Sequence, residues 1–170
     1  WNDGMNRVGE HGAGESVWLG WFLCTTLAAF EDIARQRKDA HAAESWSHRR
    51  VALAEALDRH GWDGAWYRRA YFDDGTPLGT STADECQIDT IAQSWAVMSG
   101  VAGPDKARSA MDQVESRLID WDARIAHLFW PPFETHVPDP GYIQSYPAGI
   151  RENGGQYSHG AIWAIYAFAR

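Results

Sequence analysis

The sequence predicts an all-α fold built from successive helical hairpins. Apolar residues recur at helical spacing in four segments, a fifth segment is apolar almost all round, and polar or Gly/Pro-rich breaks separate them. A length of 170 residues, a hydrophobic content of 45% and ten tryptophans are enough for a real core. Both ends of the chain fall in patterned sequence, so we expect residues 1–170 to be a single partial domain of a larger protein.

The first two helices are expected to form an antiparallel hairpin. The first should lead from Gly14-Glu15-Ser16 to about Arg37, because apolar residues fall at i, i+4, i+7 and i+11. The second should run from about Ala40 to Arg59 and close on His60-Gly61. The positions that carry the first pattern are Val17, Trp21, Cys24 and Ala28.

The rest of the chain alternates between loops and helices. Residues 62–79 favour a small hairpin or extended loop, followed by a third helix from about Gln87 to Ser99. A fourth helix should start after Gly103-Pro104-Asp105 and continue to about Leu118. Prolines and aromatic residues make 121–146 a long ordered loop, and a last helix begins near His159.

Composition excludes some classes of partner. The net charge of −8, without a Lys/Arg block, argues against nucleic acid and anionic membranes, whereas a neutral sugar polymer is indifferent to it. Cys24 and Cys86 are expected to be buried free thiols in a cytoplasmic setting, and the cysteines and histidines show no metal-ligand spacing. No stretch approaches the ~18–20 consecutive apolar residues of a membrane span, although the parent protein could carry one elsewhere.

The first candidate site segment is Trp1-Asn2-Asp3-Gly4-Met5-Asn6-Arg7. An indole two residues before a carboxylate is the pair that a sugar site needs, because a pyranose ring stacks on the indole while the acid reaches the glycosidic oxygen. Asn-Asp-Gly is also common in turns, and for this segment alone a turn is the favoured interpretation.

The second candidate segment is Gly149–His159, with the sequence GIRENGGQYSH. Its glycines allow the backbone to approach a ligand, and Arg151 and His159 can donate charge-assisted hydrogen bonds to phosphate or carboxylate oxygens. The following helix would present its positive end to such an anion. Taken alone, the segment fits a helix-capping loop better.

Together the two segments resemble glycoside hydrolase family 94. The similarity rests on WNDGMNRVG, GESVWL and YPAGIRENGGQYSH, and it extends through WYRRAY, DEC and QSWAV over nearly all 170 residues. This family consists of inverting glycoside phosphorylases and includes the carboxy-terminal domain of bacterial cyclic β-1,2-glucan synthases. Within the family, the similarity is closest to that glucan synthase domain.

The resemblance implies a fold and a set of roles. It implies an (α/α)₆ toroid, of which this chain would be roughly the second half. It makes Asp3 the general acid, Trp1 and Tyr146 sugar contacts, Arg151 a sugar or phosphate-side contact and His159 a phosphate ligand. The disaccharide phosphorylases of the family carry an acidic residue where this chain has Tyr142. An aromatic side chain suits an oligomer, so a β-glucan, with a 1,2-linkage favoured, is the expected substrate.

Several other polar residues have structural interpretations. Glu85 and Asp89 flank a helix start and are expected to cap it, with a place at the cleft mouth as an alternative for Glu85. Gln93 is either a buried amide or a further sugar contact. Arg68 and Arg69 are expected on a solvated strand face.

Three functions remain open on the sequence alone. The first is phosphate-dependent glycosyl transfer, for which inorganic phosphate is a co-substrate and no cofactor is expected. The second is an inverting hydrolase with Glu152 or Glu85 as its base. The third is a non-catalytic module that binds glucan and measures its length. In the first case we expect 170 residues on their own to be inactive, because half a ring holds the acid without the complete phosphate site.

Overall fold

Five α-helices dominate the computed structural model, which describes residues 3–170 and, for Asp3, the backbone alone. The helices are α1 (Val17–Gln36), α2 (Ala40–His60), α3 (Thr90–Ser99), α4 (Pro104–Leu118) and α5 (Ser158–Phe168), and two 3₁₀ helices are η1 (Asp3–Met5) and η2 (Tyr142–Ser145). Seven two-residue strands are β1 (Glu15–Ser16), β2 (Ala70–Tyr71), β3 (Pro77–Leu78), β4 (Ile88–Asp89), β5 (Ile119–Asp120), β6 (Ile125–Ala126) and β7 (Phe129–Trp130). The prediction of a mainly helical fold is confirmed.

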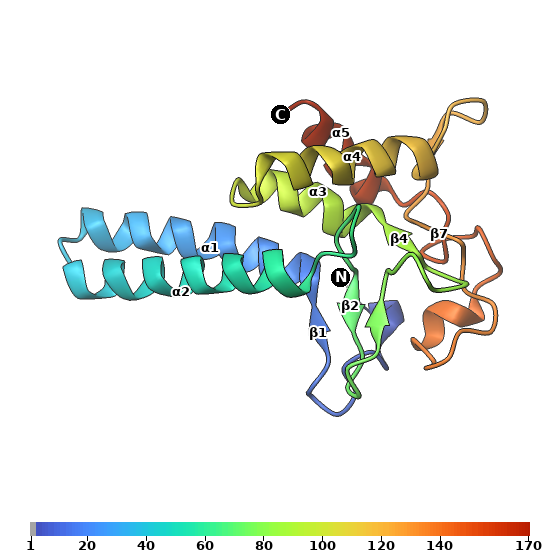
Figure 1. The fold of residues 1–170 in the computed structure, drawn as a ribbon, viewed down its shortest axis with the longest axis horizontal. Coiled ribbons are helices and arrows are strands. Elements are labelled where there is room, and N and C mark those ends of the chain that lie inside the picture. Colours follow the sequence, from blue (N-terminus) through green and yellow to red (C-terminus); the bar gives the residue numbers. More distant parts are fainter. Residues whose placement is uncertain (1–2) are drawn as a thin grey trace.

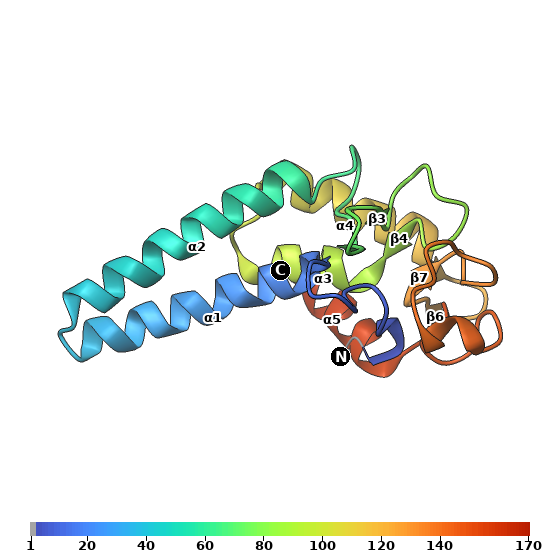
Figure 2. The ribbon, with the colours of Figure 1, turned by 90° about the horizontal axis from the view of Figure 1, so that it is seen from below.

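The helices are arranged in two rows. α1 and α2 form the predicted antiparallel hairpin, which projects from the remainder of the molecule (Figures 1 and 2). α3 contacts α1 on one side and α5 on the other, and α4 packs on α3. Thus α1, α3 and α5 form one row, with α2 and α4 behind it. Local sequence explains the ends of α2, because the Asp39 carboxylate accepts a hydrogen bond from Ala42 N at 3.0 Å and Gly61 forms the C-cap.

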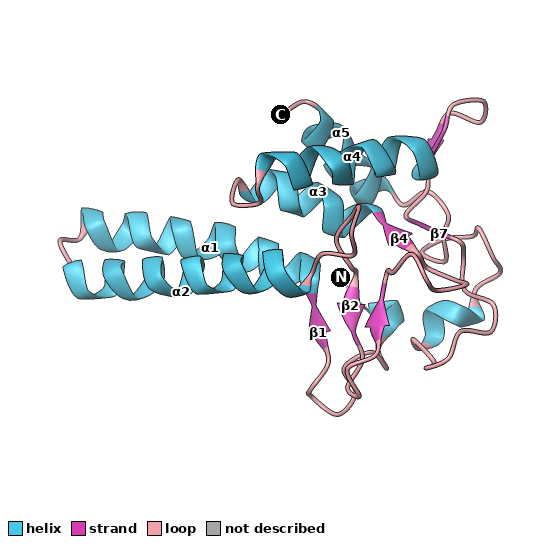
Figure 3. Ribbon diagram, viewed as in Figure 1, coloured by secondary structure: helices cyan, strands magenta, loops and turns pink. Residues whose placement is uncertain are grey.

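Short strands lie at the end of the molecule opposite the α1–α2 loop (Figure 3). β1, β2 and β3 form an antiparallel sheet, in which Ser16 pairs with Ala70 and Ala70 pairs with Leu78. β1 leads directly into α1, and β4 leads directly into α3. Each of these helices is therefore fixed in space at its N-terminus by a strand.

Two sequence predictions about this region need correction. The third helix begins at Thr90 rather than near Gln87, because Ile88 and Asp89 pair with Trp130 and Phe129 as strands β4 and β7. The segment 121–146 is ordered as predicted but is not a plain loop, since it contains β6, β7 and η2. Helical periodicity extends past the true start of α3, and two-residue strands are too short to show an alternating pattern.

Arg69 is the largest departure from the sequence analysis. Instead of lying on a solvated strand face, its side chain is fully buried, and its Nε pairs with Asp89 Oδ2 at 2.9 Å. Its Nη1 reaches Ser16 Oγ at 3.3 Å, and its carbonyl accepts from Val17 N at 3.2 Å. Asp89 in turn caps α3 through Ile91 N and Ala92 N. One arginine thus links the first residues of α1 and α3.

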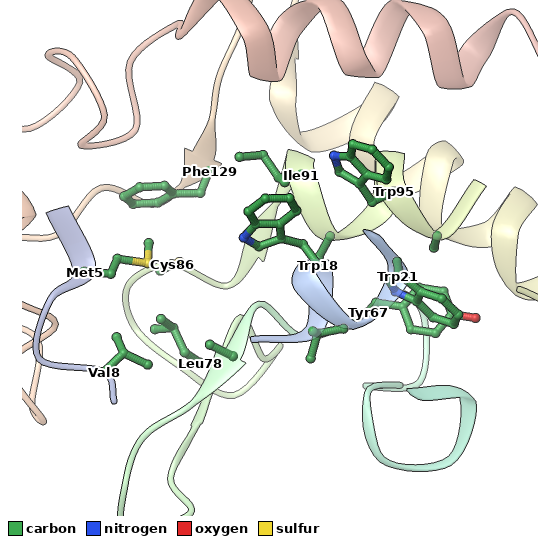
Figure 4. Packing of buried hydrophobic residues seen from close by; sticks show 14 of the residues in the cluster. Met5, Val8, Trp18, Trp21, Tyr67, Leu78, Cys86, Ile91, Trp95 and Phe129 are labelled. Atoms are coloured by element: carbon green, nitrogen blue, oxygen red, sulfur yellow. The ribbon is translucent and has the colours of Figure 1, made fainter. Parts of the chain in front are cut away.

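The main core lies where the helices meet the strands (Figure 4). Trp21 of α1 and Tyr67 are fully buried and make an edge-to-face contact with ring centroids 5.0 Å apart. Met5 and Val8 belong to the same cluster, and Met5 lies beside Cys86 in Figure 4. The segment after Asp3 is therefore anchored in the core.

Both cysteines are buried free thiols, as predicted. Burial raises the pKa of Cys24 to about 11, and burial also raises the pKa of Cys86 well above its ordinary value. Neither thiol is a reactive thiolate at neutral pH.

Several large apolar side chains remain exposed on α1 and α5. Four large apolar residues of α5 are exposed, whereas Trp163 of the same helix packs against Trp18 and Trp95. By length and composition alone, α1 could cross a membrane. This is weak evidence of a membrane span, because α1 forms a hairpin with α2. The exposed residues are Leu19, Phe22, Leu23, Phe30 and Ile33 on α1, and Ile162, Ile165, Tyr166 and Phe168 on α5.

The buried ion pair predicts a large stability effect. We expect Arg69→Met to lower the free energy of unfolding by about 3–5 kcal/mol, because it leaves the buried Asp89 carboxylate without its cation. Asp58→Asn is the matched control: its pair with Lys106 is partly exposed, so the loss should stay below about 1 kcal/mol. Denaturant titration of the two variants measures both values, and equal losses would contradict this role for Arg69.

Candidate functional site

The first candidate segment lies against the loop that precedes the second candidate segment in the sequence. η1 contacts η2, so the residues after Asp3 lie against the loop that carries Tyr142 and Tyr146. Asn6 Oδ1 accepts a hydrogen bond from Tyr142 N at 3.1 Å, and Arg7 N donates to Pro140 O at 3.3 Å. Arg7 Nη1 also pairs with Asp139 Oδ2 at 2.5 Å. These contacts join segments more than 130 residues apart in sequence.

Gly141 is required at this junction. Its φ of 116° is in the region that favours glycine, and a Cβ added there would lie 2.3 Å from Asn6 Oδ1 and 2.9 Å from Gly4 O. On the opposite side, a Cβ on Gly4 would lie 3.0 Å from Ile143 Cβ. The two backbones approach as closely as they do because both positions lack a side chain.

Two of the predicted site residues lie at the edge of what the structure describes. Asp3 is the first residue of η1, and its side chain lies outside the described part of the chain, as does the whole of Trp1. The geometry of the general acid and of this indole therefore remains a prediction. What the structure gives is the backbone that carries Asp3 and its position against η2.

Tyr142, Tyr146 and Arg151 form a continuous aromatic and cationic surface. The rings of Tyr142 and Tyr146 are perpendicular, with centroids 6.1 Å apart, and Tyr142 is 46% exposed. Arg151 Cζ lies 4.5 Å from the Tyr146 ring centroid, which is a cation–π distance, and Arg151 Nε lies 3.3 Å from Glu152 Oε2. This surface can stack a sugar ring and donate hydrogen bonds to its oxygens.

Asn153 organises the loop that carries this surface, a role that the sequence analysis missed. It is fully buried, its Oδ1 accepts from Phe133 N at 2.7 Å, and its Nδ2 donates to Phe133 O and to Tyr146 O at 2.9 and 2.8 Å. Gly155, two residues after Asn153, has no room for a side chain, since a Cβ would lie 2.8 Å from the carbonyl oxygens of Gly149 and Arg151. In the sequence, this arrangement shows only as an asparagine followed by two glycines.

His159 lies in the first turn of α5, as predicted. It is half-buried, and its ring makes edge contacts with Tyr157 and Trp163 at centroid distances of 4.9 and 5.0 Å. Burial lowers the pKa of the imidazole below its usual range, while the charge of Glu152 acts in the opposite direction. The ring is thus fixed in orientation and neutral at pH 7, at a helix end that favours anions.

Gln93 does not belong to this site, which corrects its assignment as a sugar contact. The side chain is fully buried, its Oε1 accepts from Tyr67 N at 2.7 Å, and its Nε2 donates to Tyr67 O and Asp89 O at 2.8 and 2.9 Å. The two bonds to Tyr67 join α3 to the segment before β2, and the bond to Asp89 O lies at the start of α3. The alternative of a buried amide accounts for Gln93.

Glu85 also has a different role from the one expected. Its carboxylate does not cap α3 but accepts hydrogen bonds from Glu134 N and Thr135 N, each at 3.0 Å. It therefore holds the loop after β7. Among residues 3–170, no group of three His, Cys, Asp or Glu side chains is placed to hold a metal ion.

The comparisons with known proteins show the family of the chain. Residues 1–170 match the family described as "Glycosyl hydrolase 94 superfamily, catalytic domain". The chain is 56% identical to the cyclic beta-(1,2)-glucan synthase NdvB of Rhizobium meliloti over 99% of its length, and these residues make up 6% of that protein.

Two phosphorylases are more distant relatives. The solabiose phosphorylase of Paenibacillus borealis is 36% identical over 98% of the chain, and the N,N'-diacetylchitobiose phosphorylase of Vibrio furnissii is 33% identical over 100%. The matched part covers 22% and 21% of these two proteins, so the chain spans about a fifth of their length or less. The chain belongs to the glycosyl hydrolase 94 superfamily, as a part of its catalytic domain.

Proposed function

We propose that this chain is the part of a glycoside phosphorylase domain that carries the general acid, the sugar platform and one phosphate ligand. The complete domain would catalyse inverting phosphorolysis of a β-glucan, with a 1,2-linkage favoured by the 56% identity to the Rhizobium glucan synthase. The observation that carries the proposal is the contact of η1 with η2, which brings the segment that begins with Asp3 against the loop that carries Tyr142 and Tyr146.

The reaction assigns one step to each group. Asp3 would donate a proton to the glycosidic oxygen while a phosphate oxygen attacks the anomeric carbon from the opposite face of the sugar. The bond from that carbon to the leaving sugar breaks, and a β-linkage yields an α-sugar phosphate. Tyr146, Tyr142 and Trp1 would stack sugar rings, and Arg151 would contact the sugar or the phosphate side. His159 would donate one N–H to phosphate at the N-terminus of α5.

The contacts of the other acids favour phosphorolysis over hydrolysis. An inverting hydrolase needs a second carboxylate ~6.5–9.5 Å from the acid to activate water. The Glu85 carboxylate holds the loop after β7 through Glu134 N and Thr135 N, and Glu152 is paired with Arg151. Phosphate is itself the nucleophile, so a phosphorylase needs no such base. Release of reducing sugar at the same rate with and without phosphate would favour the hydrolase.

The exposed apolar faces support the proposal of a larger ring. Large apolar side chains on α1 and α5 face solvent in these 170 residues, and a row of α1, α3 and α5 backed by α2 and α4 is the arrangement expected for part of an (α/α)₆ toroid. We infer that further hairpins of the complete protein cover these faces on the cytoplasmic side of the cell. In a cyclic glucan synthase such a domain would control glucan length.

The general acid gives the first test of this function. In the complete protein, Asp3→Asn should lower phosphorolysis by ~10²–10⁴-fold, because the amide keeps the shape of the acid but donates no proton to the leaving oxygen. Release of sugar 1-phosphate is the measurement, and Asp122→Asn, an exposed acid in the β5–β6 turn, is the control. Near-normal turnover in the Asp3 variant would leave the non-catalytic glucan-binding module as the better interpretation.

His159 gives the second test. His159→Ala should raise the KM for phosphate about ten-fold or more, the effect of losing one hydrogen bond to a charged ligand, and change the KM for glucan much less. His41→Ala is a matched control, because His41 also lies in the first turn of a helix but is exposed at the start of α2. Equal losses for both substrates would show that His159 orders the site without contacting phosphate.

A further inference from the structure

A cavity lies next to the loop that carries the surface of Tyr142, Tyr146 and Arg151. It has a volume of about 450 Å³ and is lined by residues of three segments that are distant in sequence. Its size falls within the ~300–1,000 Å³ that is usual for small-molecule sites. The lining residues are Asp84 and Glu85, then Trp130, Pro131, Pro132 and Glu134, and finally Ala148 and Gly149.

Trp130 is presented to this cavity by a rigid element. It is 44% exposed, whereas its neighbour Phe129 on the same strand is fully buried, so the alternation of β7 places the indole outward. β7 is paired with β4, and the His127 ring packs against the indole at a centroid distance of 5.0 Å. An exposed indole held in this way is suited to stack on the C–H face of a sugar ring.

The polar wall of the cavity consists of acceptors. The Glu85 carboxylate is fixed by Glu134 N and Thr135 N, and the exposed carboxylates of Asp84 and Glu134 lie beside it. Among the described residues that line the cavity there is no lysine or arginine. Carboxylates without cations repel phosphate and other anions, but they accept hydrogen bonds from the hydroxyl groups of a neutral sugar.

The cavity shares a wall with the proposed active site. Ala148 and Gly149 line it and follow Tyr146 by two and three residues. Gly149 N donates to Asn153 O at 2.8 Å, and the Asn153 side chain holds the Tyr146 carbonyl. A glucan that leaves the Tyr146 platform in this direction would reach Trp130.

We propose that the cavity beside Trp130 is an outer subsite for β-glucan chains longer than a disaccharide. The indole stacks one sugar unit, and the carboxylates of Asp84, Glu85 and Glu134 accept hydrogen bonds from its hydroxyl groups. The identity of the ligand rests on the proposed function. With this subsite, the complete enzyme prefers long β-glucan chains to disaccharides.

Chain-length dependence tests the subsite in the complete protein. For Trp130→Ala, the ratio of kcat/KM on a linear β-1,2-glucan to kcat/KM on the β-1,2-linked disaccharide should fall by about three- to ten-fold, as expected for one lost aromatic contact. Asp84→Asn should lower the same ratio by about two- to five-fold through a weaker acceptor. Trp121→Ala, which removes a 70% exposed indole from the turn after β5, is the matched control and should leave the ratio unchanged.

Direct binding separates this inference from the proposed function. Calorimetric titration of the linear β-1,2-glucan without phosphate should show a weaker Kd for Trp130→Ala than for the unmodified protein, even if no phosphorolysis occurs in either. A ratio and a Kd that are unchanged in Trp130→Ala, or that change equally in Trp121→Ala, would overturn the subsite. Loss of phosphate dependence in the unmodified protein, with Trp130-dependent binding retained, would overturn the phosphorylase alone.

Discussion

The ion pair of Arg69 with Asp89 is the constraint on which the rest of the structure depends. Helices α1 and α3 both start beside this ion pair, since Arg69 contacts Ser16, the residue before α1, and Asp89 caps α3. A fully buried guanidinium is costly unless its charge is paired and its N–H groups are hydrogen-bonded, so this junction has little freedom to shift. The functional loops are attached to the same junction through β4 and β7. The positions of these loops therefore depend on the Arg69–Asp89 ion pair, which lies in the core.

The candidate site itself depends on close backbone approaches more than on side-chain packing. Gly4 and Gly141 allow η1 and η2 to touch, and Gly155 allows the last loop to fold back on its own carbonyl groups. Asn153 then fixes the loop by bonding to both Phe133 and Tyr146. A surface formed in this way holds aromatic rings and a cation in place with only the short 3₁₀ helix η2 beneath them.

Sequence reasoning predicted the helices well and the junctions poorly. α1, α2, α4 and α5 follow from apolar periodicity and capping residues, because these signals are local. The buried role of Arg69 was not predicted, and the sequence did not decide between a buried amide and a sugar contact for Gln93, since each side chain depends on a partner about 20 residues or more away that periodicity does not identify. Glu85 was misplaced for the same reason. The residues of the site were recognised from their resemblance to a family, and the structure adds how Asn153 and Gly141 hold them.

The hydrogen bonds of Asn153 also affect how readily this residue deamidates. An asparagine followed by glycine is prone to deamidation, in which the backbone nitrogen of the glycine attacks the side-chain amide carbon and ammonia is lost. Here both atoms of the amide are bonded, and Gly154 N donates to Glu152 O at 3.0 Å, so the attacking nitrogen is held elsewhere. A carboxylate at this position could not donate to Tyr146 O. The hydrogen bonds that shape the loop thus also protect its most vulnerable peptide from chemical decay.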